Sequence, residues 1–298
     1  MKNSKLMLCV LGSVLAFTVA AATAADAPKL TFKFSKTKVP GALQTLPSGI
    51  SNSGVTVGQY EDSSGVSHGY ILKGKNLTTL DDPNGEAGTT YANQITLNGT
   101  VAVVGAYLSP ADSSVGFVYK GGQYTDVPGP AGAVASVANG VNDYEAIVGA
   151  YTDSRGKTHG FLLTGNGYTT LDVPGSSATY AAGVNDKEDI VLYWLDSAGA
   201  FESSLHHGKG KTYKTINVPR ATNSFASNIS NKGDVSYEWL DSSGAAHGAL
   251  LHAGKYYKFD YPKAVLTYGG GINDKSTIVG GYETKSKGPY SGFEASYK

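Results

Sequence analysis

Residues 140–151 read GVNDYEAIVGAY, and residues 271–282 read GINDKSTIVGGY. Related stretches, each with an aliphatic residue ten positions before a tyrosine or tryptophan, bring the number of copies to six. We take that aliphatic residue as the anchor of each repeat, and the anchors are Ile50, Leu97, Val141, Val184, Ile229 and Ile272. Successive anchors are 43 to 47 residues apart. A period of this length is typical of four-stranded propeller blades, so the pattern predicts one blade per repeat.

The two ends of the chain complement each other. Several repeats finish with a strand that leads to a proline ten residues before the next anchor, namely Pro174, Pro219 and Pro262. The last repeat stops at Lys298 without this strand, whereas residues 30–34 supply an alternating strand before Pro40. Pairing the N-terminal strand into the last blade would protect both edges. We therefore predict an all-β fold, a six-bladed β-propeller of four-stranded antiparallel blades closed by the N-terminal strand, in one domain over residues 25–298.

Residues 1–24 differ from the repeats. Lys2 and Lys5 precede an apolar stretch over residues 6–19, and residues 22–24 read ATA, which fits a small-residue cleavage site. This order is typical of a secretory signal peptide. A membrane anchor is the alternative, although the apolar stretch is short for a span. We predict a secreted or periplasmic bacterial protein with no membrane span after signal removal.

The charge of the remaining chain excludes one class of partner. The full sequence has 24 basic and 24 acidic side chains, and removing Lys2 and Lys5 with the signal leaves 22 basic against 24 acidic ones. A nearly neutral domain has no electrostatic attraction for nucleic acid. The single cysteine, Cys9, lies within the signal segment. We expect a monomer without disulfides, a cofactor or a nucleic-acid partner.

One repeat serves to place the strands. In the repeat anchored at Val184 we expect strands over residues 178–184, 189–194, 201–205 and 213–218, from the innermost to the outermost. Glycine occurs on the second strand of four repeats, as in Gly149, and we expect it to admit large side chains from the neighbouring blade.

The repeat pattern also resembles a known family. Over residues 141–161 it reads Val-Asn-Asp, then Ile-Val-Gly, then Gly-x-x-His-Gly-Phe. This resembles the extracellular HAF-type repeats of exported bacterial proteins, with Gly69, Gly160 and Gly248 where that family usually has alanine. The resemblance covers residues 30–298. It implies secretion and a β-fold built from repeats, and it implies no defined activity or catalytic residues.

Three histidines occupy one repeat position, six residues after an aspartate that begins an Asp-Ser-x-Gly turn. The pairs are Asp62 with His68, Asp153 with His159, and Asp241 with His247. Across a tight hairpin the two side chains can meet, and we expect pairs that hold each blade together. Metal binding is the alternative, but ligands must converge on one ion and these histidines belong to separate blades. We therefore predict no metal site.

The fourth and fifth repeats depart from the others. They have Leu192 and Tyr237 in place of the second-strand glycine, and they contain the two tryptophans of the chain. We consider a groove that binds sugars, whose C–H faces stack on aromatic rings. It would be lined by Tyr193, Trp194, Tyr237, Glu238 and Trp239. The alternative is that the tryptophans compensate for altered packing in the core.

Three functions remain open at this point. The first is a secreted, non-catalytic module that binds a glycan or a surface partner. The second is a secreted hydrolase or lyase with its site at the channel mouth, formed by Asp143, Asp186 and Asp274, although an Asn-Asp corner is more simply a turn. The third is a structural envelope component that presents its flat faces to other proteins.

Overall fold

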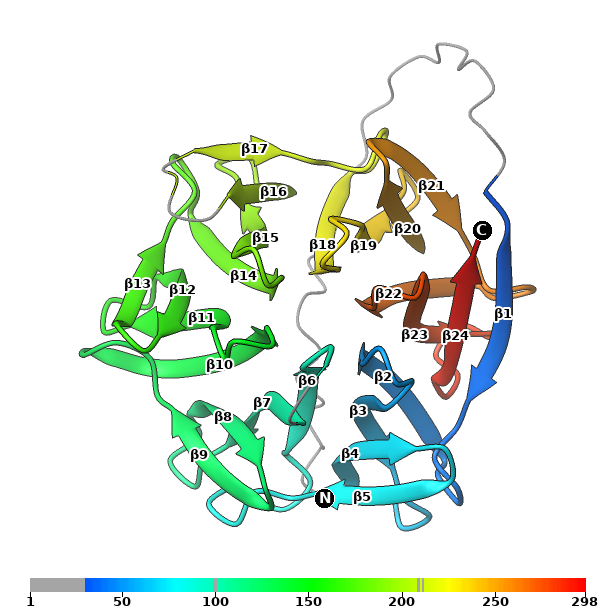
Figure 1. Cartoon of the computed structure of the whole chain (residues 1–298), viewed down its shortest axis with the longest axis horizontal. Coiled ribbons are helices and arrows are strands. Elements are labelled where there is room, and N and C mark those ends of the chain that lie inside the picture. Colours follow the sequence, from blue (N-terminus) through cyan, green and yellow to red (C-terminus); the bar gives the residue numbers. More distant parts are fainter. Residues whose placement is uncertain (1–29, 99–100, 208–209, 211) are drawn as a thin grey trace.

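The computed structural model of the chain describes residues 30–98, 101–207, 210 and 212–298. Within these ranges it contains 24 strands in six four-stranded antiparallel sheets, and no helix. The sheets surround a central axis as the blades of a propeller (Figure 1). The predicted six-bladed β-propeller is confirmed. The predicted signal segment, residues 1–24, lies outside the described residues.

Each blade is a meander whose strands run outward from the axis in chain order. Blade 1 contains β2 (Gln44–Ile50), β3 (Thr56–Glu61), β4 (Ser67–Lys73) and β5 (Asn76–Leu80). Blade 2 contains β6 (Tyr91–Ile95), β7 (Ala102–Leu108), β8 (Ser114–Lys120) and β9 (Gln123–Val127). Blade 3 contains β10 (Ala133–Val141), β11 (Ile147–Asp153), β12 (Thr158–Thr164) and β13 (Gly167–Leu171).

The second half of the chain repeats this order. Blade 4 contains β14 (Ala178–Val184), β15 (Asp189–Leu195), β16 (Phe201–His207) and β17 (Tyr213–Thr215). Blade 5 contains β18 (Asn223–Ile229), β19 (Val235–Leu240), β20 (Ala246–His252) and β21 (Lys255–Phe259). Blade 6 contains β22 (Leu266–Ile272), β23 (Thr277–Glu283), β24 (Ser291–Tyr297) and, as its outermost strand, β1 (Phe32–Thr37).

The ring closes through β1, which pairs antiparallel with β24. Phe32 lies opposite Tyr297, and Thr37 lies opposite Gly292. The blue N-terminal strand therefore lies beside the red C-terminal one (Figure 1). The Phe32 ring also packs on Phe259 of blade 5, with 4.7 Å between the ring centroids. This confirms the closure that the sequence predicted.

The innermost strands are tied to one another around the axis by polar side chains. Ser48 donates a hydrogen bond to the carbonyl of Ala92 (2.6 Å), and Asn93 donates to Ala138 (3.0 Å). Asn139 and Ser227 make the same link to the blade that follows each of them. Each bond satisfies a carbonyl that faces the axis, so neighbouring blades are held at a fixed spacing.

The hydrophobic core lies between blades. In the interface between blades 4 and 5, Val191 and Ala182 pack with Ile229, Tyr237 and other buried residues of one cluster. Each blade hides an apolar face against its neighbour, which removes that surface from water on both sides.

The second-strand glycines make room for an aromatic residue of their own blade. Gly149 lies opposite Phe161 of β12, and a Cβ atom at Gly149 would lie 2.8 Å from two carbons of the Phe161 ring. The expectation that the neighbouring blade supplies the large side chain is therefore wrong. In blades 4 and 5 the large side chain is on the second strand and the small one on the third. Leu192 lies opposite Ser204, and Tyr237 lies opposite Ala249.

The meander gives the disc two distinct faces. The first-turn face carries the turns between the first and second strands of each blade, such as residues 142–146. The second-turn face carries the turns between the second and third strands, such as residues 153–157, and the connections from blade to blade. In the described ranges no helix is long and apolar enough to cross a membrane.

Candidate functional site

A ring of six side chains, one from each blade, surrounds the channel mouth on the first-turn face. It consists of Asn52, Asn98, Asp143, Asp186, Asn231 and Asp274. The backbone N–H of Asp143 donates to the Asp186 carboxylate (2.9 Å), and that of Asp186 donates to Asn231 Oδ1 (2.8 Å). The same bond from Asp274 to Asn52 joins the last blade to the first.

The second oxygen of each ring aspartate is also bound. Asn231 Nδ2 donates to Asp186 Oδ2 (2.7 Å), and Asn98 Nδ2 donates to Asp143 Oδ2 (2.9 Å). Asn52 Nδ2 donates to Asp274 Oδ2 (2.9 Å). Carboxylates held in this way fasten one blade to the next, and they are poorly arranged for attack on a substrate.

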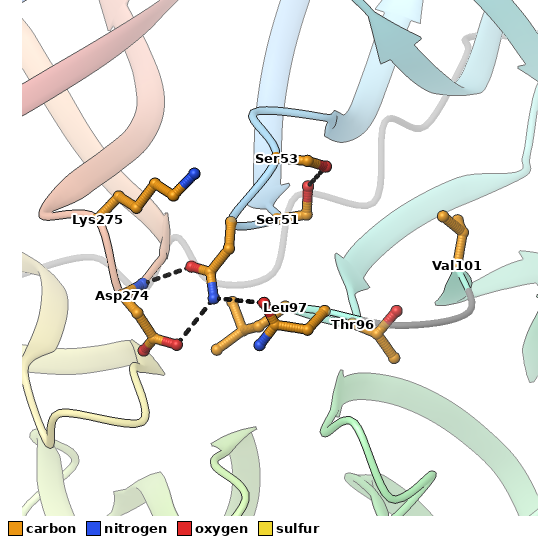
Figure 2. A pocket seen from close by; sticks show the side chains of 9 residues that line it. Ser51, Ser53, Thr96, Leu97, Val101, Asp274 and Lys275 are labelled. Carbon is orange, nitrogen blue, oxygen red and sulfur yellow. Dashed lines mark hydrogen bonds between the residues drawn. The ribbon is translucent and has the colours of Figure 1, made fainter.

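A pocket of about 450 Å³ opens beside this ring between blades 6, 1 and 2. Figure 2 shows Asp274 and Lys275 on one side of it and Thr96, Leu97 and Val101 on the other. The ring was only partly recognised from sequence, because Asn52, Asn98 and Asn231 were not singled out. The signal was present, since every repeat has Asn or Asp one or two positions after its anchor.

A larger cavity, of about 720 Å³, lies at the other end of the channel, on the second-turn face. Residues of the innermost strands of all six blades form part of its wall, and it extends between blades 5 and 6. Its aromatic and acidic lining residues come from β6, β15, β18, β19, β22, β23 and the turn before β24. They are Tyr91, Tyr193, Phe225, Glu238, Tyr268, Glu283 and Tyr290.

Glu238 is the most perturbed carboxyl group in this cavity. Burial raises its pKa to about 7, because the ionised form loses its hydration there. Among the residues that the structure describes, none donates a hydrogen bond to the Glu238 carboxylate and none forms an ion pair with it. Glu283 is only 4% exposed.

Two tyrosines stand beside these carboxylates. The hydroxyls of Tyr268 and Tyr290 are 3.3 Å apart. Burial raises the pKa of Tyr268, and the neighbouring Tyr290 and Glu238 raise it further. Burial also raises the pKa of Tyr290, and Glu283 adds to that shift. Both phenols therefore stay protonated at neutral pH and can donate a hydrogen bond to a ligand.

The five residues predicted to line one groove do not share one surface. Tyr193 and Glu238 reach the cavity. Tyr237 is fully buried, and its hydroxyl donates to the carbonyl of Ile216 (3.0 Å). Trp239 is 7% exposed in the same core cluster. The single groove is therefore a wrong prediction, because neighbouring residues on a strand point to opposite sides of the sheet.

The tryptophans take the place of tyrosines that pack on histidines in other blades. Tyr151 stacks on His159 with 5.0 Å between the ring centroids, and Trp239 stacks on His247 at 4.6 Å. Lys258 Nζ lies 3.5 Å from the centroid of the Trp239 ring. Trp194 is half-buried and donates from Nε1 to Ser204 Oγ (3.0 Å). These contacts agree with the alternative explanation, in which the tryptophans serve packing.

Each of the three predicted histidines lies between two aspartates. His159 Nε2 is 3.5 Å from the turn residue Asp153, and its Nδ1 is 2.8 Å from Asp172. The corresponding distances are 3.6 and 2.8 Å for His68 with Asp62 and Asp81. For His247 they are 3.4 Å to Asp241 and 2.9 Å to Asp260.

The closer partner of each histidine was not foreseen. Asp81, Asp172 and Asp260 lie thirteen residues after their histidines, at the end of the outermost strand. The signal was this constant spacing, together with the Asp-x-Pro motif that begins at the aspartate in all three blades. In the described ranges no group of three or more His, Cys, Asp or Glu side chains is arranged to hold a metal ion.

Sequence reasoning also missed five of these aromatic and acidic residues. Tyr91, Phe225 and Tyr268 lie on innermost strands, where no feature of the repeat distinguishes them. Glu283 precedes the turn between β23 and β24, and Tyr290 is the last residue of this turn, which is seven residues long, compared with five in blade 1. This longer turn was the available signal.

No protein-family model matches the sequence, and no curated protein matches it. Several solved structures are similar in fold. AofleA from Arthrobotrys oligospora is 15% identical with a TM-score of 0.51, over 88% of this chain and 81% of that one. A structure of SapL1 lectin in complex with alpha methyl fucoside is 11% identical with a TM-score of 0.50, over 84% and 92% of the two chains.

An enzyme shares the fold as well. Trypanosoma rangeli sialidase is 11% identical with a TM-score of 0.57, and the match covers 90% of this chain and 59% of that one. At these identities the likeness concerns the fold alone, so the chain is a six-bladed propeller similar in architecture to AofleA, to SapL1 lectin and to a sialidase.

Proposed function

We propose that this protein is an exported, monomeric, non-catalytic module that binds a glycan in the cavity of the second-turn face. The observation that carries the proposal is the combination of aromatic rings and carboxylates around one open volume of about 720 Å³. Aromatic faces stack on the C–H faces of sugars, while carboxylates and phenols bond to hydroxyls. SapL1, a lectin bound to a fucoside, has a similar fold and supports the proposal.

The proposal of export rests on the sequence. Residues 1–24 have the order of a signal peptide, and the repeats resemble those of the HAF type in exported proteins. The HAF resemblance stays a prediction because no family model matches the chain.

Binding of the chain from Ala25 onward to a broad glycan array tests the function. We expect selective binding that weakens about tenfold or more in Tyr193→Leu and Tyr268→Leu, because leucine keeps apolar packing but removes the stacking face. Tyr144→Leu is the matched control, because Tyr144 is 78% exposed on the first-turn face. If both cavity variants fold and still bind with wild-type affinity, the binding surface must lie elsewhere.

Glycoside hydrolysis is a second candidate, favoured by one observation. The cavity holds two carboxyl groups, and burial raises the pKa of Glu238 to about 7, as a general acid requires. This candidate moves the site from Asp143, Asp186 and Asp274 to the opposite mouth, because those aspartates are bound within the ring. Release of reducing sugar by the wild type, abolished in Glu238→Gln, would support it, and binding without turnover would exclude it.

A further inference from the structure

The cavity on the second-turn face is lined by two carboxyl groups and one amine. The acidic and basic side chains that line it are those of Glu238, Glu283 and Lys287. Lys287 is exposed in the turn between β23 and β24, at the rim, whereas Glu283 is buried. A ligand that enters the cavity therefore passes the amine of Lys287 at the rim and meets the carboxyl groups deeper in.

Glu238 has no partner of its own among the described residues. It faces Tyr268 of β22, and the charges of Glu238 and Glu283 both act on Tyr268 and Tyr290. The phenol groups of Tyr268 and Tyr290 lie hydroxyl to hydroxyl, 3.3 Å apart. A carboxyl group that loses hydration without gaining a cationic partner is costly to ionise. A cation supplied by a ligand would remove that cost.

The aromatic residues of the cavity suit the same ligand. Tyr193, Phe225, Tyr268 and Tyr290 border the space that the two glutamates face. An ammonium group is attracted to the face of an aromatic ring as well as to a carboxylate, and both attractions grow when water is excluded. A neutral sugar would use the rings but leave the carboxylates without a counter-charge.

We infer that the cavity binds a glycan that carries a protonated primary amine, a deacetylated glucosamine unit, with the ammonium group between Glu238 and Glu283. This inference rests on the proposed glycan-binding function and specifies its ligand. The sugar ring stacks on the aromatic residues, and the amine replaces the missing partner of Glu238.

Calorimetry with matched oligosaccharides tests the inference. The probes are glucosamine oligomers, N-acetylglucosamine oligomers of the same length, and spermidine as an amine without a sugar ring. At pH 6 we expect the glucosamine oligomer to bind at least tenfold more tightly than its acetylated counterpart and than spermidine. In Glu238→Gln this preference should be lost, whereas Glu86→Gln, a change at an exposed loop residue, should keep it.

The release of protons when the glucosamine oligomer binds to the wild-type protein gives a second measurement, which does not depend on whether a variant folds. With a pKa of about 7, Glu238 is mostly protonated at pH 6 and must ionise to pair with the amine. Titrations in buffers of different ionisation enthalpy should therefore report a net release of protons when the glucosamine oligomer binds, and this release should be absent in Glu238→Gln.

The outcomes separate this inference from the proposed function. Equal or tighter binding of the acetylated oligomer would overturn the amine assignment and leave glycan binding in place. Spermidine bound as tightly as the oligosaccharide would overturn the sugar assignment. Binding of the glucosamine oligomer without proton release, or unchanged in Glu238→Gln, would overturn the role of Glu238. Failure of every glycan tested would overturn the proposed function as well.

Discussion

Gly149 and Phe161 lie opposite each other on neighbouring strands, and in blade 5 the corresponding residues are Tyr237 and Ala249. One large and one small side chain share the site in both cases, but the large one has changed strands. The combined volume of the two facing side chains is therefore conserved between the blades, although the residue at each of the two positions differs. Close packing imposes this pairing, because a site with two large residues would clash and one with two small residues would leave a void.

The pairing predicts the effect of Gly149→Ala. The added Cβ atom would lie 2.0 Å from the carbonyl oxygen of Val137 and 2.8 Å from the Phe161 ring, so backbone or ring must move. We expect a loss of about 1–3 kcal/mol in the free energy of unfolding, measured by denaturant titration. Gly165→Ala in the same blade is the control, because nothing lies within 4 Å of its Cβ position. Equal stability of both variants would contradict this account.

At the scale of residues, the sequence predicted the cavity only in part. Tyr193 and Glu238 were selected as neighbours of tryptophan, and both reach the cavity. Tyr237 was selected because it replaces the second-strand glycine, and Trp239 as one of the two tryptophans, and both are buried. Aromatic residues serve packing and binding equally well, so residue type alone could not separate them. The separation depends on which side of the strand faces the channel, which requires the register.

At the scale of elements, the hairpin between the second and third strands is held by one aspartate. In blade 5, Asp241 Oδ1 accepts hydrogen bonds from the backbone N–H groups of Ser243 (2.7 Å) and Ala245 (3.0 Å). Its other oxygen lies 3.4 Å from His247. The turn and the histidine contact thus depend on the same carboxylate. Burial opposes ionisation of Asp241, but the hydrogen bond from the Ser243 hydroxyl (2.7 Å) and the two backbone bonds outweigh it and lower the pKa to about 2.

This carboxylate predicts a dependence of stability on acid. The folded-state pKa is about 2 and the unfolded value is about 3.9, so the unfolded chain binds more protons between these values. The contribution of Asp241 is fully present above pH 4 and is lost as the pH falls through about 2. Because the side chain is partly exposed, we expect Asp241→Asn to cost less than about 1 kcal/mol at neutral pH.

Denaturant unfolding between pH 2 and pH 7 measures this effect. The stabilities of the wild type and Asp241→Asn should converge near pH 2. Asp112→Asn, in an exposed turn of blade 2, should stay parallel to the wild type throughout. A constant difference between wild type and Asp241→Asn down to pH 2 would show that the charge is not involved.

Strands and turns were well predicted because the repeats restate them six times. The strand expected over residues 178–184 is β14, and the outermost strand of that blade ends three residues earlier than expected, at Thr215. The turn before Tyr290 occurs once in the chain, so no repeat could reveal its role. Features that are repeated could be inferred from the sequence, and features that break the repeat could not.

At the scale of the whole molecule, the ring is closed by a strand from the opposite end of the chain. β1 covers the edge of β24, and Phe32 and Phe34 pack on the Phe259 and Phe293 rings. An unpaired edge strand invites pairing with other chains. Removing the cover would expose both backbone groups and aromatic surface.

Deletion of residues 30–37 tests the closure. We expect a lower melting temperature and formation of dimers or larger species, measured by calorimetry and by light scattering after size exclusion. A synthetic peptide of residues 30–40 added in trans should restore the monomer, because it can pair with β24 as β1 does. A truncated chain that stays monomeric at the wild-type melting temperature would show that β1 contributes little to closure.

The pairing of β1 with β24 also fixes the order in which the molecule can be completed. Residues 32–37 are synthesised about 260 residues before their partners, residues 292–297. Blades 1 to 5 can form while the chain is still being made, but the sixth must wait for residues 292–297. Until those residues have left the ribosome, β1 has no strand to pair with and the ring of blades stays open.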